Sequence, residues 1–83
     1  MDEAHVKEKV RKVFLEVFGM GENGFHFGMT SEHIRDWDSL SHMNLVSGLE
    51  KEFNVSLDID EISDMDSVQK AVDIIKKKLE AKG

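Results

Sequence analysis

Cysteine and proline are both missing from this 83-residue chain. Without cysteine, the chain can form no disulfide bond, no thiolate metal site and no cysteine nucleophile. Any thiol chemistry must therefore come from a group that is attached to the protein. The sequence also lacks an apolar run near the roughly 20 residues that cross a membrane, and its start lacks the basic and apolar regions of a signal peptide. We therefore expect a cytoplasmic protein without a membrane span.

The composition is that of a small globular protein, with 34% charged and 40% hydrophobic residues. A chain of 83 residues is short enough for one domain, which we expect to span residues 1–83. Such a domain has a small core and only a modest free energy of unfolding. We expect it to be a monomer.

Negative charge is concentrated in the middle of the chain. The net charge is −6 overall, but residues 30–66 hold ten acidic and two basic residues and so carry −8. The remaining residues carry +2. A surface with this negative charge repels nucleic-acid phosphates and attracts proteins with basic docking patches. We therefore expect protein partners and no binding to nucleic acid.

Hydrophobic residues recur at helical spacing, which predicts an all-α fold. Residues 3–18 form a first long helix that Gly19 ends, and residues 39–53 form a second that Asn54 ends. Between them lies a long connection, in which we expect a helical turn over residues 31–35. Its large apolar side chains should pack across the ends of the helices. These anchors are Met20, Phe25, Phe27, Met29, Ile34 and Trp37.

The rest of the chain adds a short helix and a third long one. Residues 58–64 form the short helix, with Asp58 as its cap. The last helix starts at Asp66, with Gln69 in the position of a capping box. The predicted bundle therefore has three main helices, one short helix and a long first loop. Its core, and any cavity within it, would be lined by Leu45, Val46, Leu49, Phe53, Ile62, Val68, Val72 and Ile75.

A serine stands at the start of the second helix, in the run Asp-Trp-Asp-Ser-Leu from Asp36 to Leu40. Asp and Ser are favoured N-cap residues, so an isolated pair of this kind usually only starts a helix. Here Leu follows the pair directly, and the helix behind it keeps its apolar spacing through Phe53. In this setting Asp38-Ser39-Leu40 resembles the acyl carrier protein family.

The resemblance implies that Ser39 carries a 4′-phosphopantetheine arm taken from coenzyme A. In the family, the thiol at the end of this arm holds acyl groups as thioesters. The protein shuttles them between enzymes of fatty-acid, lipid or polyketide-type synthesis. The resemblance therefore implies a four-helix acyl-carrier-like bundle and a phosphoprotein without catalytic activity. A cysteine-free chain suits this role, because no second thiol competes for the acyl group.

The resemblance also implies two kinds of partner with basic docking patches. A phosphopantetheinyl transferase would attach the arm, because no His or Lys in the chain is well placed to activate the serine hydroxyl. Acyl-activating, condensing or acyltransferase enzymes would then load and use the arm. For the docking of these partners we expect Asp36, Asp38, Leu40, Met43, Glu50, Glu52, Asp60 and Glu61.

The second helix departs from the pattern of carriers in fatty-acid synthesis, whose exposed face is acidic just after the serine. Here the residues expected on that face are Ser41, His42, Asn44, Ser47 and Gly48. Trp37 before Asp38 is also more similar to stand-alone carriers of specialised pathways. Both differences argue against a housekeeping role in fatty-acid synthesis.

Two other interpretations stay open at this point. One is a carrier of aminoacyl or peptidyl groups, although the strong net acidity favours acyl groups. The other is an unmodified helical interaction module in which Ser39 only caps a helix. An enzyme is disfavoured, because the sequence offers no credible nucleophile–base or carboxylate pair.

Metal sites are not expected from the sequence. Counted from Asp58, an EF-hand loop needs an oxygen ligand at position five, Gly at six and Glu at twelve. The chain has Ile62, Ser63 and Gln69 at those positions. The histidines lack metal-ligand spacing, and we expect them on the surface or in loops. They are His5, His26, His33 and His42.

Overall fold

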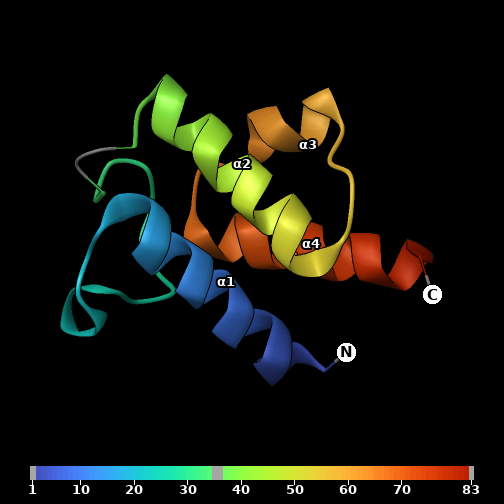
Figure 1. The fold of residues 1–83 in the computed structure, drawn as a ribbon, viewed down its shortest axis with the longest axis horizontal. Coiled ribbons are helices and arrows are strands. Elements are labelled where there is room, and N and C mark those ends of the chain that lie inside the picture. Colours follow the sequence, from blue (N-terminus) through green and yellow to red (C-terminus); the bar gives the residue numbers. More distant parts are fainter. Residues whose placement is uncertain (1, 35–36, 83) are drawn as a thin grey trace.

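The computed structural model describes residues 2–34 and 37–82, and Figure 1 shows that they form a helical bundle. Three long helices and one short helix follow one another, with a 3-10 turn in the first loop. Among the described residues, the only strand-like pairing is an isolated antiparallel bridge between Thr30 and Ser67. The predicted all-α fold with four helices is therefore confirmed. The elements are α1 (Glu3–Phe18), η1 (Glu22–Gly24), α2 (Ser39–Phe53), α3 (Ile59–Asp64) and α4 (Val68–Lys82).

Both long helices of the first half have the predicted bounds, and their ends have clear causes. The Asp2 carboxylate accepts a hydrogen bond from the His5 N–H group and so caps α1. Gly19 and Asn54 end α1 and α2 with positive φ angles of 62° and 54°. Glycine and asparagine tolerate this left-handed conformation better than other residues, which is why the helices stop there.

The predicted start of α4 is wrong by one residue. Ser67, and not Asp66, caps the helix, because its hydroxyl accepts a hydrogen bond from the Lys70 N–H group at 3.1 Å. The Ser67 carbonyl accepts the first helical hydrogen bond, from Ala71, also at 3.1 Å. Serine and aspartate are both good caps, so the sequence pattern could not separate two neighbouring candidates. Gln69 consequently has no place in a capping box.

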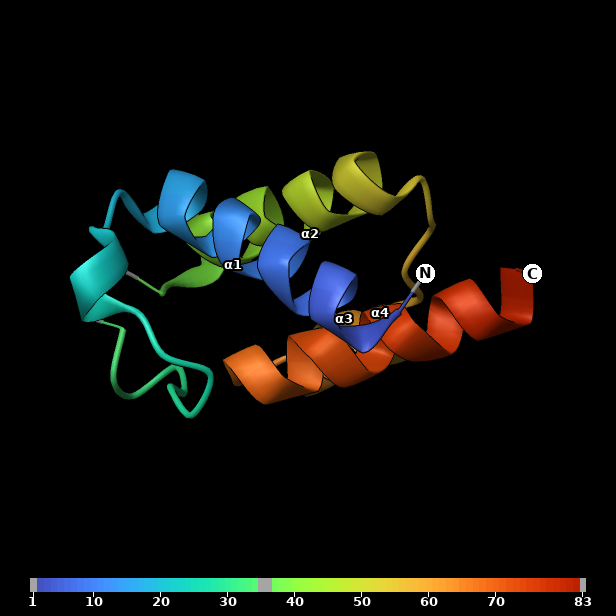
Figure 2. The same cartoon turned by 90° about the horizontal axis from the view of Figure 1, so that it is seen from below.

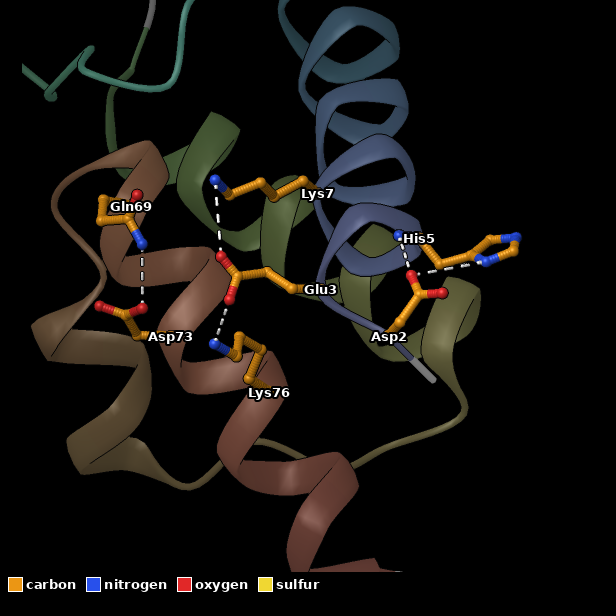
Figure 3. Close-up of polar contacts among 7 residues, drawn as sticks. All are labelled: Asp2, Glu3, His5, Lys7, Gln69, Asp73 and Lys76. Carbon is orange, nitrogen blue, oxygen red and sulfur yellow. Dashed lines mark hydrogen bonds and ion pairs between the residues drawn. The ribbon is translucent and has the colours of Figure 1, made fainter.

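Asp66 and Gln69, which were predicted to form the capping box, form other contacts. The Asp66 carbonyl accepts a hydrogen bond from the Ser31 N–H group at 2.9 Å, which ties the first loop to the start of α4. The Gln69 side chain donates to Oδ1 of Asp73, one turn further along α4, at 3.0 Å (Figure 3).

The core lies between the three long helices. α1 packs against both α2 and α4, and Figure 2 shows α1 and α2 above α4. The predicted core residues are buried, although Ile62 is only half-buried. Leu57 and Met65, on either side of α3, join the core without having been predicted. None of the helices that the structure describes is long and apolar enough to cross a membrane. The buried residues are Val6, Val10, Val13, Phe14, Ile34, Leu45, Val46, Leu49, Phe53, Leu57, Met65, Val68, Ala71, Val72 and Ile75.

α1 and α2 approach each other closely at Gly48. The sequence placed this residue on the exposed face of α2, but the residue is half-buried against α1. A Cβ atom at position 48 would lie 2.9 Å from Cγ1 of Val13, closer than real side chains pack. The missing side chain therefore allows the two helices to pack at this distance.

The first loop packs against the ends of the helices, as predicted. Ile34 is buried, and the other five anchors are partly buried against the core. Phe14 of α1 joins two of them, with its ring centroid 6.0 Å from that of Phe25 and 5.5 Å from that of Trp37. The described part of the predicted helical turn is confirmed, because the Ile34 N–H group donates to the Thr30 carbonyl at 3.2 Å.

An ion-pair network joins the start of α1 to α4, at the end of the bundle where both termini lie (Figures 1 and 3). Glu3 lies between two lysines, 2.7 Å from Nζ of Lys76 and 3.6 Å from Nζ of Lys7. The hydrogen bond and the charge of Lys76 lower the pKa of Glu3, and Glu3 in turn raises the pKa of Lys76. Exposed pairs of this kind add little stability, so apolar packing provides most of the contact between α1 and α4.

Candidate functional site

Asp38, and not Ser39, is the N-cap of α2. The Asp38 carboxylate accepts a hydrogen bond from the Ser41 N–H group at 2.9 Å, and its backbone is extended, as a cap requires. Ser39 is the first residue within the helix and is exposed. Its hydroxyl group forms no hydrogen bond with any residue that the structure describes. The interpretation of Ser39 as a helix cap is therefore wrong, and its hydroxyl is accessible for chemistry.

The Asp38 carboxylate holds a negative charge beside Ser39. Hydrogen bonds to the carboxylate, above all from the Ser41 N–H group, lower the pKa of Asp38 against the opposing effect of burial. The start of a helix favours anions, because its free N–H groups carry partial positive charge. An anion attached to Ser39 would share this positive field with the Asp38 carboxylate.

His42 lies one turn after Ser39 and holds two neighbouring segments. Its Nδ1 accepts a hydrogen bond from Nε1 of Trp37 at 2.8 Å, and its Nε2 donates one to the carbonyl oxygen of Ile62 in α3 at 2.7 Å. Because the indole only donates and the carbonyl only accepts, the neutral ring carries its proton on Nε2. The prediction of a surface histidine is wrong here, since His42 is half-buried. His5, His26 and His33 are exposed, as predicted.

The hydrogen bonds of His42 leave Ser39 without a general base in the described part of the chain. Both ring nitrogens of His42 have partners other than the serine hydroxyl. A primary hydroxyl is a weak nucleophile without an adjacent base. Any reaction at Ser39 would therefore need a base from another protein. The described residues also contain no group of three or more side chains that could hold a metal ion.

A shallow depression opens beside Ser39. Its walls come from the first loop, the first turn of α2 and the junction between α3 and α4. The depression is open to solvent, whereas the predicted cavity-lining residues other than Ile62 are buried in the packed core. It is lined by Ser31, Trp37, Asp38, Ser39, His42, Met65 and Asp66.

Large apolar side chains are exposed on the two helices near this depression. Leu40 and Met43 of α2, both predicted as docking residues, are 73% and 52% exposed. Ile59 at the start of α3 is 81% exposed, which the sequence pattern did not predict. The signal that could have found it is the position of Ile59 at the start of a helix of only six residues, directly after the cap Asp58.

Two of the predicted docking acids have partners within the protein. Oε2 of Glu50 accepts a hydrogen bond from the Leu57 N–H group at 2.8 Å and so holds the segment that leads to α3. The Glu52 carboxylate lies 3.6 Å from Nζ of Lys9 and 3.5 Å from Nζ of Lys12, which joins α2 to α1. A docking role for these acids stays a prediction, and it would compete with these contacts.

The remaining predicted acids differ in their surroundings. Glu61 lies 2.9 Å from Nζ of Lys78 and accepts a hydrogen bond from the Asp58 N–H group at 2.8 Å. Burial opposes the charged form of Glu61, but these two contacts outweigh it and lower the pKa of Glu61. Asp60 is exposed and forms no ion pair with a described residue. Asp36 lies outside the described residues.

Comparison with solved structures shows a strong structural likeness to an acyl carrier protein. No protein-family model matches the chain. The fold resembles that of a holo acyl carrier protein from Geobacter metallireducens, solved by NMR in solution, with a TM-score of 0.81 and 28% sequence identity. The match covers 93% of this chain and 88% of that one. This likeness confirms the predicted resemblance to acyl carrier proteins and the predicted bundle.

Proposed function

We propose that this chain is a non-catalytic carrier protein, modified at Ser39 with 4′-phosphopantetheine, that shuttles acyl groups between enzymes. The observation that carries the proposal is the exposed Ser39 hydroxyl, which has no hydrogen-bond partner among the described residues. It stands in the first turn of α2, in a fold that matches a holo acyl carrier protein. The proposal includes one domain over residues 1–83, a monomeric state and a cytoplasmic location.

Attachment of the arm would form a phosphodiester at Ser39. The serine oxygen attacks the phosphorus atom that bears pantetheine in coenzyme A, and the pyrophosphate bond breaks. The adenosine bisphosphate part leaves, and the serine proton passes to a base. Because both nitrogens of His42 are engaged, a phosphopantetheinyl transferase must supply that base.

The residues around Ser39 suit a covalently attached phosphate. The phosphodiester would lie at the start of α2, where the helix dipole and free N–H groups favour an anion. Asp38 caps the helix, so modification of Ser39 would leave the cap in place. When attached, the arm supplies the thiol that the cysteine-free chain lacks and holds the acyl group as a thioester.

The docking surface that we favour combines exposed apolar groups with a free acid. Leu40 and Met43 are exposed next to Ser39, and Asp60 is exposed on α3 without an ion pair to a described residue. Partner enzymes with basic patches around an apolar centre would complement them. These enzymes would be the transferase and the acyl-activating, condensing or acyltransferase enzymes of lipid, fatty-acid or polyketide-type synthesis.

The experiment that tests the modification is intact-protein mass spectrometry after incubation with coenzyme A and a broad-specificity phosphopantetheinyl transferase. We expect the wild-type chain to gain the mass of one phosphopantetheine and Ser39→Ala to gain none. Ser47→Ala is the matched control, because Ser47 is another exposed serine of α2, and it should load like the wild type. A wild-type chain that several transferases leave unmodified, or a Ser39→Ala variant that is still modified, would contradict the proposal.

A further inference from the structure

The short helix α3 has little apolar packing of its own. It has six residues, none of them buried, and its first residue, Ile59, is 81% exposed. The buried residues Leu57 and Met65 lie just outside the helix on either side of it. Apart from these two residues and the half-buried Ile62, polar contacts position α3 against the bundle.

Two polar contacts hold α3 from different helices. On α4, Nζ of Lys78 lies 3.5 Å from the Asp58 carboxylate and 2.9 Å from the Glu61 carboxylate. On α2, Nε2 of His42 donates to the carbonyl oxygen of Ile62 at 2.7 Å. The lysine contacts are charge pairs at side chains, whereas the histidine contact is a hydrogen bond to the backbone of α3.

The histidine contact joins α3 to the first loop as well as to α2. Nδ1 of His42 accepts the Trp37 indole N–H at 2.8 Å, and the two rings stack with centroids 6.0 Å apart. Trp37 in turn packs on Phe14 and Phe18 of α1, with ring centroids 5.5 Å from each. One imidazole thus connects α3, the start of α2 and the aromatic cluster.

Only the neutral form of His42 can make both hydrogen bonds. The indole needs an acceptor at Nδ1 and the carbonyl needs a donor at Nε2. A protonated ring donates from both nitrogens, so it would present an N–H group to the Trp37 N–H group. Histidine is also the side chain whose charge changes within the ordinary range of cellular pH.

The charged groups around His42 are acidic. Asp38 and Asp66 line the same depression as the ring, and no lysine or arginine does so among the described residues. The adjoining α3 carries Asp60, Glu61 and Asp64, of which Glu61 is paired with Lys78. The part of α1 that packs on Trp37 contributes only Phe14 and Phe18.

We propose that His42 is a pH-sensitive latch, which in its neutral form ties Trp37 to the start of α2. On protonation it releases the Trp37 indole, while its Nε2–H group still donates to α3. The latch lies beside Ser39, because His42, Trp37 and Ser39 line one depression together with Met65 at the end of α3. Release of Trp37 therefore changes the surroundings of Ser39. The inference does not depend on modification of the serine, since the hydrogen bonds are formed within the unmodified chain.

The test is an NMR titration of the full unmodified chain from about pH 8 to about pH 5. At the upper end, the ring ¹⁵N shifts of His42 should show the tautomer protonated at Nε2. As the ring is protonated, two other signals should shift with the same midpoint. They are the Trp37 indole N–H and the amide of Ser63, which shares its peptide group with the Ile62 carbonyl.

Two variants test whether His42 causes the pH response of these signals. His42→Gln keeps a side chain that can donate to the Ile62 carbonyl but cannot be protonated, so the Trp37 and Ser63 signals should lose their pH response. His26→Gln is the control, because the His26 side chain is exposed and forms no hydrogen bond with a described residue, and this variant should keep the response. The proposal is overturned if the wild-type Trp37 and Ser63 signals do not follow His42, or if His42→Gln titrates like the wild type.

Discussion

Asp38 and Ser39 are adjacent, but they have different roles at the start of α2. The Asp38 carboxylate accepts the Ser41 N–H group and caps the helix, whereas the Ser39 hydroxyl has no partner among the described residues. This division means that chemistry at Ser39 need not disturb the helix behind it. A change at Asp38 should therefore affect the cap, whereas a change at Ser39 should affect the hydroxyl group alone.

The first prediction at this scale concerns stability. Asp38→Ala should lower the free energy of unfolding, because it removes the acceptor that caps α2, while Asp38→Asn should retain most of the cap. Ser39→Ala should leave the free energy of unfolding unchanged. Urea denaturation of the three variants measures this order. An equal loss for Ser39→Ala and Asp38→Ala would show that the serine shares the cap.

The effect of the Asp38 cap should depend on pH. Hydrogen bonding lowers the pKa of Asp38 in the folded state below its unfolded value of about 3.9. Stability from the carboxylate is therefore fully present above that value and is lost as the pH falls through the folded-state pKa. The stability difference between wild type and Asp38→Asn should change over this acidic range. A difference that stays constant down to about pH 2 would rule out this linkage.

At the scale of elements, the close contact between α1 and α2 depends on one glycine. Val13 is buried in the core, and its Cγ1 atom occupies the place next to Gly48 where a Cβ atom would lie. Alanine at position 48 would gain up to about 1 kcal/mol of helix propensity. Overpacking of a well-packed contact costs about 1–3 kcal/mol, so the steric cost should exceed the gain in helix propensity.

We therefore expect Gly48→Ala to lower the free energy of unfolding by about 1 kcal/mol in a urea denaturation experiment. Val13→Ala should cost less in the Gly48→Ala background than in the wild type, because it removes the clashing Cγ1 atom. If the two changes are additive, the contact at Gly48 does not limit the distance between the helices.

The long helices could be predicted from the sequence, because they depend on local rules. Apolar periodicity located them, and Gly19 and Asn54 marked two of their ends, since these signals involve only a few neighbouring residues. The half-buried positions of His42 and Gly48 could not be predicted in this way. They depend on contacts with Ile62, twenty residues away, and with Val13 on another helix. The motif around Ser39 stood out because of its resemblance to a family, and its residues alone did not reveal a free hydroxyl.

At the scale of the whole molecule, negative charge is concentrated in the segment that contains Ser39, but its acids are not equally available to partners. The net charge of residues 30–66 is −8, yet Glu50, Glu52 and Glu61 already bind groups within the protein. Asp60 is exposed and forms no ion pair with a described residue. The structure thus separates acids that hold the bundle together from an acid that is free to steer a partner.

This separation predicts different effects of charge reversal. Asp60→Lys should slow loading by the transferase at low salt without changing the free energy of unfolding, because it removes only a steering charge. Glu52→Lys should instead weaken the contact between α1 and α2, since it places a third cation beside Lys9 and Lys12. Loading rates at two salt concentrations and urea denaturation measure the two effects. An unchanged loading rate for Asp60→Lys at low salt would remove Asp60 from the docking surface.

The central claim is that Ser39 carries an arm with an acyl group, and tandem mass spectrometry of the chain purified from its own cells tests it most directly. We predict a fragment in which Ser39 bears phosphopantetheine, and a further mass on its thiol that hydroxylamine removes, as expected of a thioester. The released mass would also distinguish an acyl from an aminoacyl cargo. An unmodified serine at position 39 in every molecule would contradict the account.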